Sequence, residues 1–158
     1  MFLLLAALST TYSPTICDPV YYRMSLLKYN NTFLIHGLWI EECAQCADCG
    51  YPTSCNNNCV IDFSAMFPLW KQLQQYWYPG PNMPIQNNKL LQHEICKHGS
   101  CFNGTQYEYM NRTLWIYDEI KQRGLMNLCN YKEKACFFIL DKNFRIENRT
   151  RTRTSECY

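Results

Sequence analysis

The sequence predicts a single α+β domain, and three observations favour this class. "TFLIHGL" (32–38) and "ACFFIL" (135–140) are typical of buried strands. Between them, residues 64–77 and 107–122 carry apolar side chains at helical spacing. No repeat, low-complexity tract or flexible linker divides the 158 residues. We therefore expect one domain over residues 1–158.

Composition limits the classes of function. Hydrophobic residues make up 47% of the chain and charged residues 18%, which is globular rather than disordered composition. The formal net charge is only +2, so the molecule carries no strong global field that would attract a polyanion. Any affinity for nucleic acid must come from a local site.

The predicted elements follow one another with clear boundaries. Gly37 ends the first strand, and a cysteine-dense loop (42–59) rich in Gly, Pro and Asn follows it. In the first helix (64–77), Pro68 is best tolerated in the first turn, and Gly124 stops the second. The apolar stripe of the first helix predicts core packing rather than a ligand site; it consists of Met66, Leu69, Trp70, Leu73 and Trp77.

The N-terminal segment "FLLLAAL" (2–8) has two interpretations. It resembles the apolar part of a secretion signal but lacks a basic segment before it. The alternative is a buried first strand of the domain. Seven apolar residues are too few to cross a bilayer, so we expect no membrane span here.

Cysteines and sequons indicate an oxidising environment. The chain has eleven cysteines and four N-x-[ST] sequons, at Asn30, Asn103, Asn111 and Asn148. Disulfides and N-glycans are both products of the secretory route. We therefore expect glycosylation at these asparagines and a secreted, or secretory and endolysosomal, location.

The segment "LLQHEICKHGSC" (90–101) holds two of the three histidines. On a helix, His93 lies above Lys97 and Glu94 lies above His98, so that all four share one polar face. A zinc-protease helix needs histidines at positions i and i+4. Position i+4 from His93 is Lys97, whose cation repels a metal ion, so we expect no metal here.

The remaining histidine, His36, lies in "FLIHGLW" (33–39). Alone it would be interpreted as a buried core histidine. Two short segments that together hold every histidine, with Lys, Glu and Trp, favour a different interpretation. One imidazole can accept the 2′-hydroxyl proton of RNA while another protonates the departing 5′-oxygen, and cations stabilise the charge on phosphorus. An aromatic side chain can hold the base by stacking.

The two histidine segments resemble the signatures of the ribonuclease T2 family. "FLIHGLW" is similar to F-x-I-H-G-L-W-P, and "HEICKHGSC" (93–101) to H-E-[WY]-x-K-H-G-[TS]-C. "LLAALSTTYSPTIC" (4–17) also resembles the family's first strand, and residues 106–120 its next helix. The resemblance implies an α+β fold with a central antiparallel sheet flanked by helices and stapled by disulfides.

The resemblance also implies roles for the polar residues. His98 would be the general base toward the 2′-hydroxyl and His36 the general acid toward the 5′-oxygen. His93 would bind the phosphate, and Glu94 and Lys97 would stabilise the transition state.

Further residues of the family's site can be assigned by the same resemblance. Trp39 would stack on the base, Tyr51 would form a second aromatic wall, and Glu41 stands where the family often carries an aspartate that contacts the base edge. The family pairs the cysteines that correspond to Cys55 and Cys101.

The other cysteines leave two alternatives. Cys43, Cys46 and Cys49 are spaced like ligands of a zinc or iron–sulfur cluster. A cluster needs four converging ligands, and Cys55 is already assigned to a disulfide. We therefore expect additional disulfides, with Cys59 and Cys96 as candidates.

The resulting expectation is a monomeric, metal- and cofactor-independent endoribonuclease. It would cleave single-stranded RNA through a 2′,3′-cyclic phosphate to 3′-phosphate ends. The main alternative is a secreted cysteine-rich glycoprotein that acts by binding a partner, and a third is a zinc-cluster protein.

Overall fold

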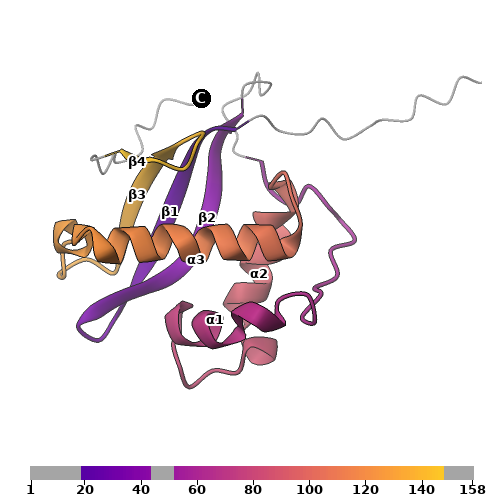
Figure 1. Cartoon of the computed structure of the whole chain (residues 1–158), viewed down its shortest axis with the longest axis horizontal. Helices are drawn as coiled ribbons and strands as arrows, with labels where there is room; N and C mark the ends of the chain where they lie inside the picture. Colours follow the sequence, from indigo (N-terminus) through magenta and orange to yellow (C-terminus); the bar gives the residue numbers. More distant parts are fainter. Residues whose placement is uncertain (1–18, 44–51, 148–158) are drawn as a thin grey trace, which may run out of the picture.

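The computed structural model describes residues 19–43 and 52–147, and within them four strands form one antiparallel sheet accompanied by three α-helices (Figure 1). The spatial strand order is β2-β1-β3-β4. The strands are β1 (Pro19–Tyr29), β2 (Thr32–Cys43), β3 (Ala135–Asp141) and β4 (Ile146–Glu147); the helices are α1 (Trp70–Tyr76), α2 (Lys89–Lys97) and α3 (Gln106–Gln122). The expected α+β fold with a central antiparallel sheet is confirmed.

Strand β1 was not predicted, although its sequence alternates. Tyr22, Met24 and Leu26 are buried under the helices, whereas Arg23 and Ser25 lie on the other face. The strand reaches β2 through a tight turn at Asn30, whose φ of 53° asparagine tolerates better than most residues. β1 therefore occupies the centre of the sheet, between β2 and β3.

Strand β2 contains a bulge at His36. Ser25 pairs with Gly37 and the next residue of β1, Leu26, pairs with Ile35, so His36 is an extra residue in β2. Before the bulge Phe33 and Ile35 face the core, and after it Leu38 and Ile40 do. The bulge thus shifts the alternation of the strand by one residue.

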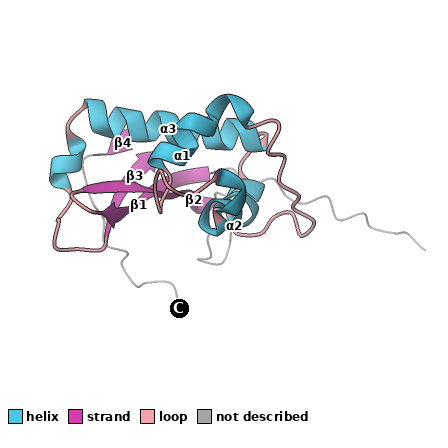
Figure 2. Cartoon of the chain, turned by 90° about the horizontal axis from the view of Figure 1, so that it is seen from below, coloured by secondary structure: helices cyan, strands magenta, loops and turns pink. Residues whose placement is uncertain are grey.

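Helix α3 covers one face of the sheet (Figure 2). It begins with a reciprocal capping box between Thr105 and Glu108. The hydroxyl of Tyr109 donates to the Leu38 carbonyl at 2.9 Å, and that of Tyr117 donates to the Phe33 carbonyl at 2.7 Å. The helix predicted over 107–122 is confirmed, and it is fixed to the main chain of β2.

The helix predicted over 64–77 forms as two pieces. A 3-10 turn (Phe67–Leu69) with Pro68 in its first turn leads into α1. Met66, Leu73 and Trp77 are fully buried, as the predicted core stripe requires. Among the described residues, no helix has the length and apolarity needed to cross a membrane.

Several sequence-based predictions lie outside the described residues. These are the segment "FLLLAAL", the side chains of the cysteine run 43–49, Tyr51 and the sequon at Asn148.

Candidate active site

Helix α2 and the residue that follows it bring four polar residues to the edge strand β2: His93, Glu94, Lys97 and His98. Asn88 begins the helix by accepting a hydrogen bond from the Leu91 amide at 3.0 Å, and its side-chain amide donates to the Tyr78 carbonyl at 3.0 Å. The helix ends at Lys97, and the His98 amide still bonds to the Glu94 carbonyl. The predicted helix over 90–97 is confirmed, and it contacts β2.

The Glu94 carboxylate lies at the centre of the site and is 1% exposed. Its Oε1 is 3.2 Å from His36 Nε2, and its Oε2 is 3.8 Å from His98 Nε2. The indole N–H of Trp39 donates to Oε2 at 2.7 Å. One buried acid therefore joins the imidazoles of the two distant histidine segments.

Each of the two His-Gly pairs needs its glycine for close packing. A β-carbon at Gly37 would collide with the Glu94 carboxylate and lie 2.9 Å from Trp39 Nε1. A β-carbon at Gly99 would lie 2.8 Å from the Tyr109 ring. The glycines thus allow α2 and α3 to approach the backbone beside each histidine.

Ser25 holds the far side of the His36 ring. Its hydroxyl lies 3.2 Å from His36 Nδ1, and the residue is fully buried. The two ring nitrogens of His36 therefore face Glu94 and Ser25, which fixes the orientation of the imidazole. Sequence analysis missed Ser25 because its strand was not predicted.

His98 is 5% exposed, and this burial lowers its pKa to about 4. Glu94 opposes the shift, whereas Lys97, His93 and His36 add to it. The imidazole is therefore neutral at mildly acidic and neutral pH, and a neutral imidazole can accept a proton.

All five predicted catalytic residues line one cavity of 240 Å³. Trp39 packs between the histidines, with ring centroids 5.1 Å from His36 and 5.3 Å from His98. Glu41 also reaches this cavity, as does Arg23, which the sequence did not indicate. The complete lining consists of Arg23, His36, Trp39, Glu41, His93, Glu94, Lys97 and His98.

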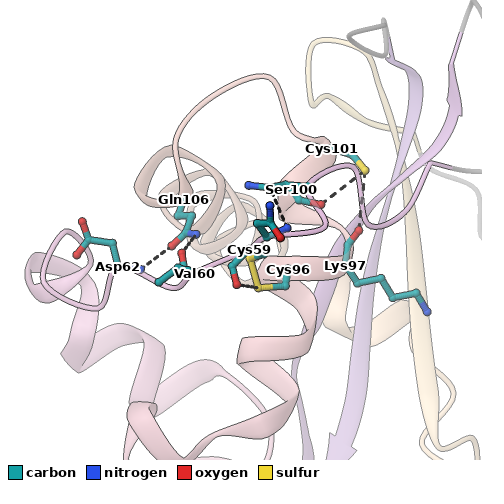
Figure 3. The surroundings of a disulfide bond; sticks show 10 residues. Cys59, Val60, Asp62, Cys96, Lys97, Ser100, Cys101 and Gln106 are labelled. Atoms are coloured by element: carbon teal, nitrogen blue, oxygen red, sulfur yellow. Dashed lines mark hydrogen bonds between the residues drawn. A yellow bond between two sulfur atoms is a disulfide. The ribbon is translucent and has the colours of Figure 1, made fainter. Parts of the chain in front are cut away.

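Two disulfides attach the loop after β2 to α2 and to the 3-10 turn that follows it (Gly99–Cys101), and Figure 3 shows the one between Cys59 and Cys96. Cys55 is bonded to Cys101, the pairing that the family resemblance implies, and Cys59 is bonded to Cys96. A third bridge joins Cys129 to Cys136. The expected additional disulfides therefore exist, and one of them uses both candidate cysteines.

Hydrogen bonds support the same loop. The Ser54 amide donates to the Lys97 carbonyl at 2.6 Å. The Gln106 amide group at the start of α3 accepts from the Asp62 amide at 2.9 Å and donates to the Val60 carbonyl at 2.8 Å (Figure 3). The loop, α2 and α3 are thereby fixed relative to one another.

One group of residues has the spacing of a metal site. Ligand atoms of His93, Glu94 and His98 all lie within 4.8 Å of one another. Glu94 is already engaged by the Trp39 indole and faces two imidazoles. A cation there would have to compete with these partners for the single carboxylate of the group.

The chain matches a known protein family over most of its length. The model of the ribonuclease T2 family matches residues 3–135, which include both histidine segments. The chain belongs to the ribonuclease T2 family. No curated protein matches it in sequence.

Solved T2-type structures share the fold at low sequence identity. The S-like ribonuclease trichomaglin is 15% identical with a TM-score of 0.59, over 89% of this chain and 95% of its own. RNase NT in complex with 5′-AMP is 14% identical, with a TM-score of 0.54 over 89% and 96% of the two chains. A mutant of RNase MC1 in complex with 5′-UMP is 14% identical, with a TM-score of 0.56 over 80% and 90%.

Proposed function

We propose that this T2-family chain is a metal-independent endoribonuclease of single-stranded RNA. It cleaves by attack of the 2′-hydroxyl, through a 2′,3′-cyclic phosphate, to 3′-phosphate ends. The observation that carries the proposal is the buried Glu94 carboxylate, which faces both His36 and His98 in a cavity that also contains His93 and Lys97.

The first step transfers two protons. Neutral His98 takes the proton of the 2′-hydroxyl, and O2′ forms a bond to phosphorus. As the bond from phosphorus to O5′ breaks, protonated His36 gives its proton to the leaving oxygen. Ser25 can accept the Nδ1–H of protonated His36, so the Nε2–H, which is held toward Glu94, is the proton that passes to the leaving oxygen. In the second step water replaces the leaving group and the two histidines exchange roles.

The transition state carries additional negative charge on the phosphoryl oxygens. His93 is exposed at the cavity and Lys97 is half-buried beside it, so both can approach those oxygens without large rearrangement. The pocket residue Trp39 supplies an aromatic surface on which a base can stack.

The disulfides suit an oxidising compartment, and we propose that the protein is secreted or acts in the secretory or endolysosomal route.

The decisive experiment digests single-stranded RNA with the purified chain in EDTA and analyses the fragment ends. We expect cyclic phosphates first and 3′-phosphates later. His98→Ala should reduce the rate by roughly 10²–10⁴. Lys97→Ala should also be impaired, whereas Lys89→Ala, at the exposed first position of α2, should retain wild-type activity.

Two results would contradict the proposal. Loss of activity in EDTA that added metal restores would place a cation in the mechanism. A folded wild-type chain without ribonuclease activity would favour the cysteine-rich glycoprotein that acts by binding a partner.

A further inference from the structure

Arg23 lies in the catalytic cavity although none of the proposed steps uses it. We propose that Arg23 determines base specificity, and that it selects guanine through the two acceptors O6 and N7. This inference rests on the proposed function, because it concerns a base bound next to the scissile phosphate.

The Arg23 side chain is held on two sides. Its Nε lies 2.8 Å from Glu41 Oε1, and its Cζ lies 5.4 Å from the centroid of the Phe137 ring. The side chains of Arg23 and Glu41 are only 12% and 17% exposed. An arginine that is paired and stacked in this way loses little conformational freedom when it binds a ligand.

The position of Arg23 on the sheet suits a base rather than the phosphate. On β1 it pairs with Trp39, whereas Ser25, two residues further along the same face, contacts His36. Two residues of a strand span about 7 Å. A phosphate among the histidines therefore lies at one end of the cavity. A base stacked on Trp39 would present its edge to Arg23 at the other end.

Glu41 is engaged with Arg23 and so acts differently from a carboxylate that contacts the base directly. The contact of 2.8 Å with Glu41 is made by Nε, the guanidinium nitrogen nearest the side-chain stem, and the two Nη groups form the tip of the planar fork. Glu41 is thus the anchor that sets the direction of the fork, and the donors at its tip contact the base.

Two parallel N–H donors discriminate among the four bases. Guanine presents two adjacent acceptors, O6 and N7, that match the fork. Adenine replaces O6 with an amino donor, which faces the guanidinium unfavourably. Uracil lacks two adjacent acceptors. Cytosine has them in N3 and O2, but its single ring offers a smaller face for stacking on Trp39. Guanine therefore combines the matching acceptors with the larger stacking surface.

This inference is tested by measuring kcat/KM for the cleavage of dinucleoside monophosphates. The set should carry each of the four bases on each side of the cleaved bond. We expect guanine at one fixed side of the cleaved bond to raise kcat/KM over adenine by roughly 5- to 150-fold. Arg23→Lys keeps the charge but removes the fork, so the guanine preference should fall to near unity while slower general cleavage persists. Glu41→Gln should weaken the preference and leave Arg23 in place.

Arg112 provides a matched control. It also lies over aromatic rings, 4.8 Å from the Phe144 centroid and 5.3 Å from that of Trp115, but it lines a different cavity. Arg112→Lys should leave the base preference unchanged. Thermal melting of every variant separates loss of specificity from loss of folding.

Three results would overturn the inference. The wild-type enzyme could show no guanine preference, or the Arg23→Lys variant could keep it. Alternatively, Arg23→Lys could lower kcat/KM equally on all substrates, which would make Arg23 a phosphate contact. Calorimetric titration with 5′-GMP and 5′-AMP tests the inference separately from catalysis. Selective binding of 5′-GMP by an inactive chain would sustain it while the nuclease proposal failed. Equal binding of the two nucleotides would reject it whether or not the chain cleaves RNA.

Discussion

His36 and Trp39 lie on the same face of β2 although their positions differ by three, an odd number. Their ring centroids are 5.1 Å apart, and both side chains contact Glu94. In a regular strand they would point to opposite faces. The bulge at His36 removes this conflict and allows one strand to place an imidazole and an indole on the same carboxylate.

Gly37→Ala should inactivate the proposed enzyme. The new β-carbon would occupy the place of the Glu94 carboxylate, and displacement of that group would misplace both histidines. Displacement of the histidines by about 1 Å lowers kcat/KM by about 10²-fold, which is measured with RNA as the substrate. Gly124→Ala, in open space but at a φ of 67°, should reduce stability without changing kcat. Normal activity of Gly37→Ala would show that the Glu94 bridge is dispensable.

The pH profile of the proposed reaction should reflect the burial of His98. The base must be neutral, and its pKa in the folded protein is about 4. As pH falls through 4 the imidazole gains a proton, so kcat/KM should decrease toward low pH with a midpoint near that value. Activity should therefore extend well below the ordinary histidine pKa of about 6.5. A low-pH midpoint at 6 or above would exclude this environment for the base.

Ser25→Ala should lower kcat with little change in KM. The serine touches His36 Nδ1 rather than the cavity, so its loss frees the imidazole to rotate. Loss of one such hydrogen bond corresponds to a decrease of roughly tenfold. Ser25→Thr, which keeps the hydroxyl, should recover part of the rate. The comparison variant is Thr113→Val, which removes another buried hydroxyl, bonded to the Tyr109 carbonyl, and should affect stability alone.

Replacement of Cys59 and Cys96 by serine should reduce the free energy of unfolding by about 2–3 kcal/mol. The two cysteines are separated by 37 residues, but the Cys55–Cys101 bridge already closes most of that loop. The additional ring contains only about ten residues, which is why the effect is smaller than for an isolated bridge. Urea denaturation measures it, and unchanged stability would contradict the assigned pairing.

Activity distinguishes this bridge from the third one. Cys96 precedes Lys97 on α2, so loss of the Cys59–Cys96 bond should also lower kcat/KM. The matching double serine variant of Cys129 and Cys136, which do not line the cavity, should lose stability and keep kcat.

The sequence predicted the parts of the site that depend on local patterns. The face shared by His93, Glu94 and Lys97 follows from helical periodicity, and α3 and β3 follow from their apolar patterns. Strand β1 was missed although Tyr22, Met24 and Leu26 alternate with polar residues.

Other features depend on tertiary contacts and have no local signal. The bulge at His36 arises from pairing with β1. The apolar residues change parity at Gly37, where the strand was predicted to end, whereas β2 continues to Cys43. The approach of Ser25 to His36 and of Arg23 to Glu41 requires two adjacent strands in a fixed register. Such contacts can be predicted only after the strand order and the bulge are known.

The tyrosines of α3 have a consequence for the interpretation of mutational scans. The carbonyls of Phe33 and Leu38 flank the bulge, and each accepts the hydroxyl of a tyrosine from the opposite side of the sheet. Phenylalanine at Tyr109 or Tyr117 would loosen the strand on either side of His36. Substitutions in α3, outside the cavity, would then mimic defects in the proposed proton transfer, and the sensitive positions would include residues on both faces of the sheet.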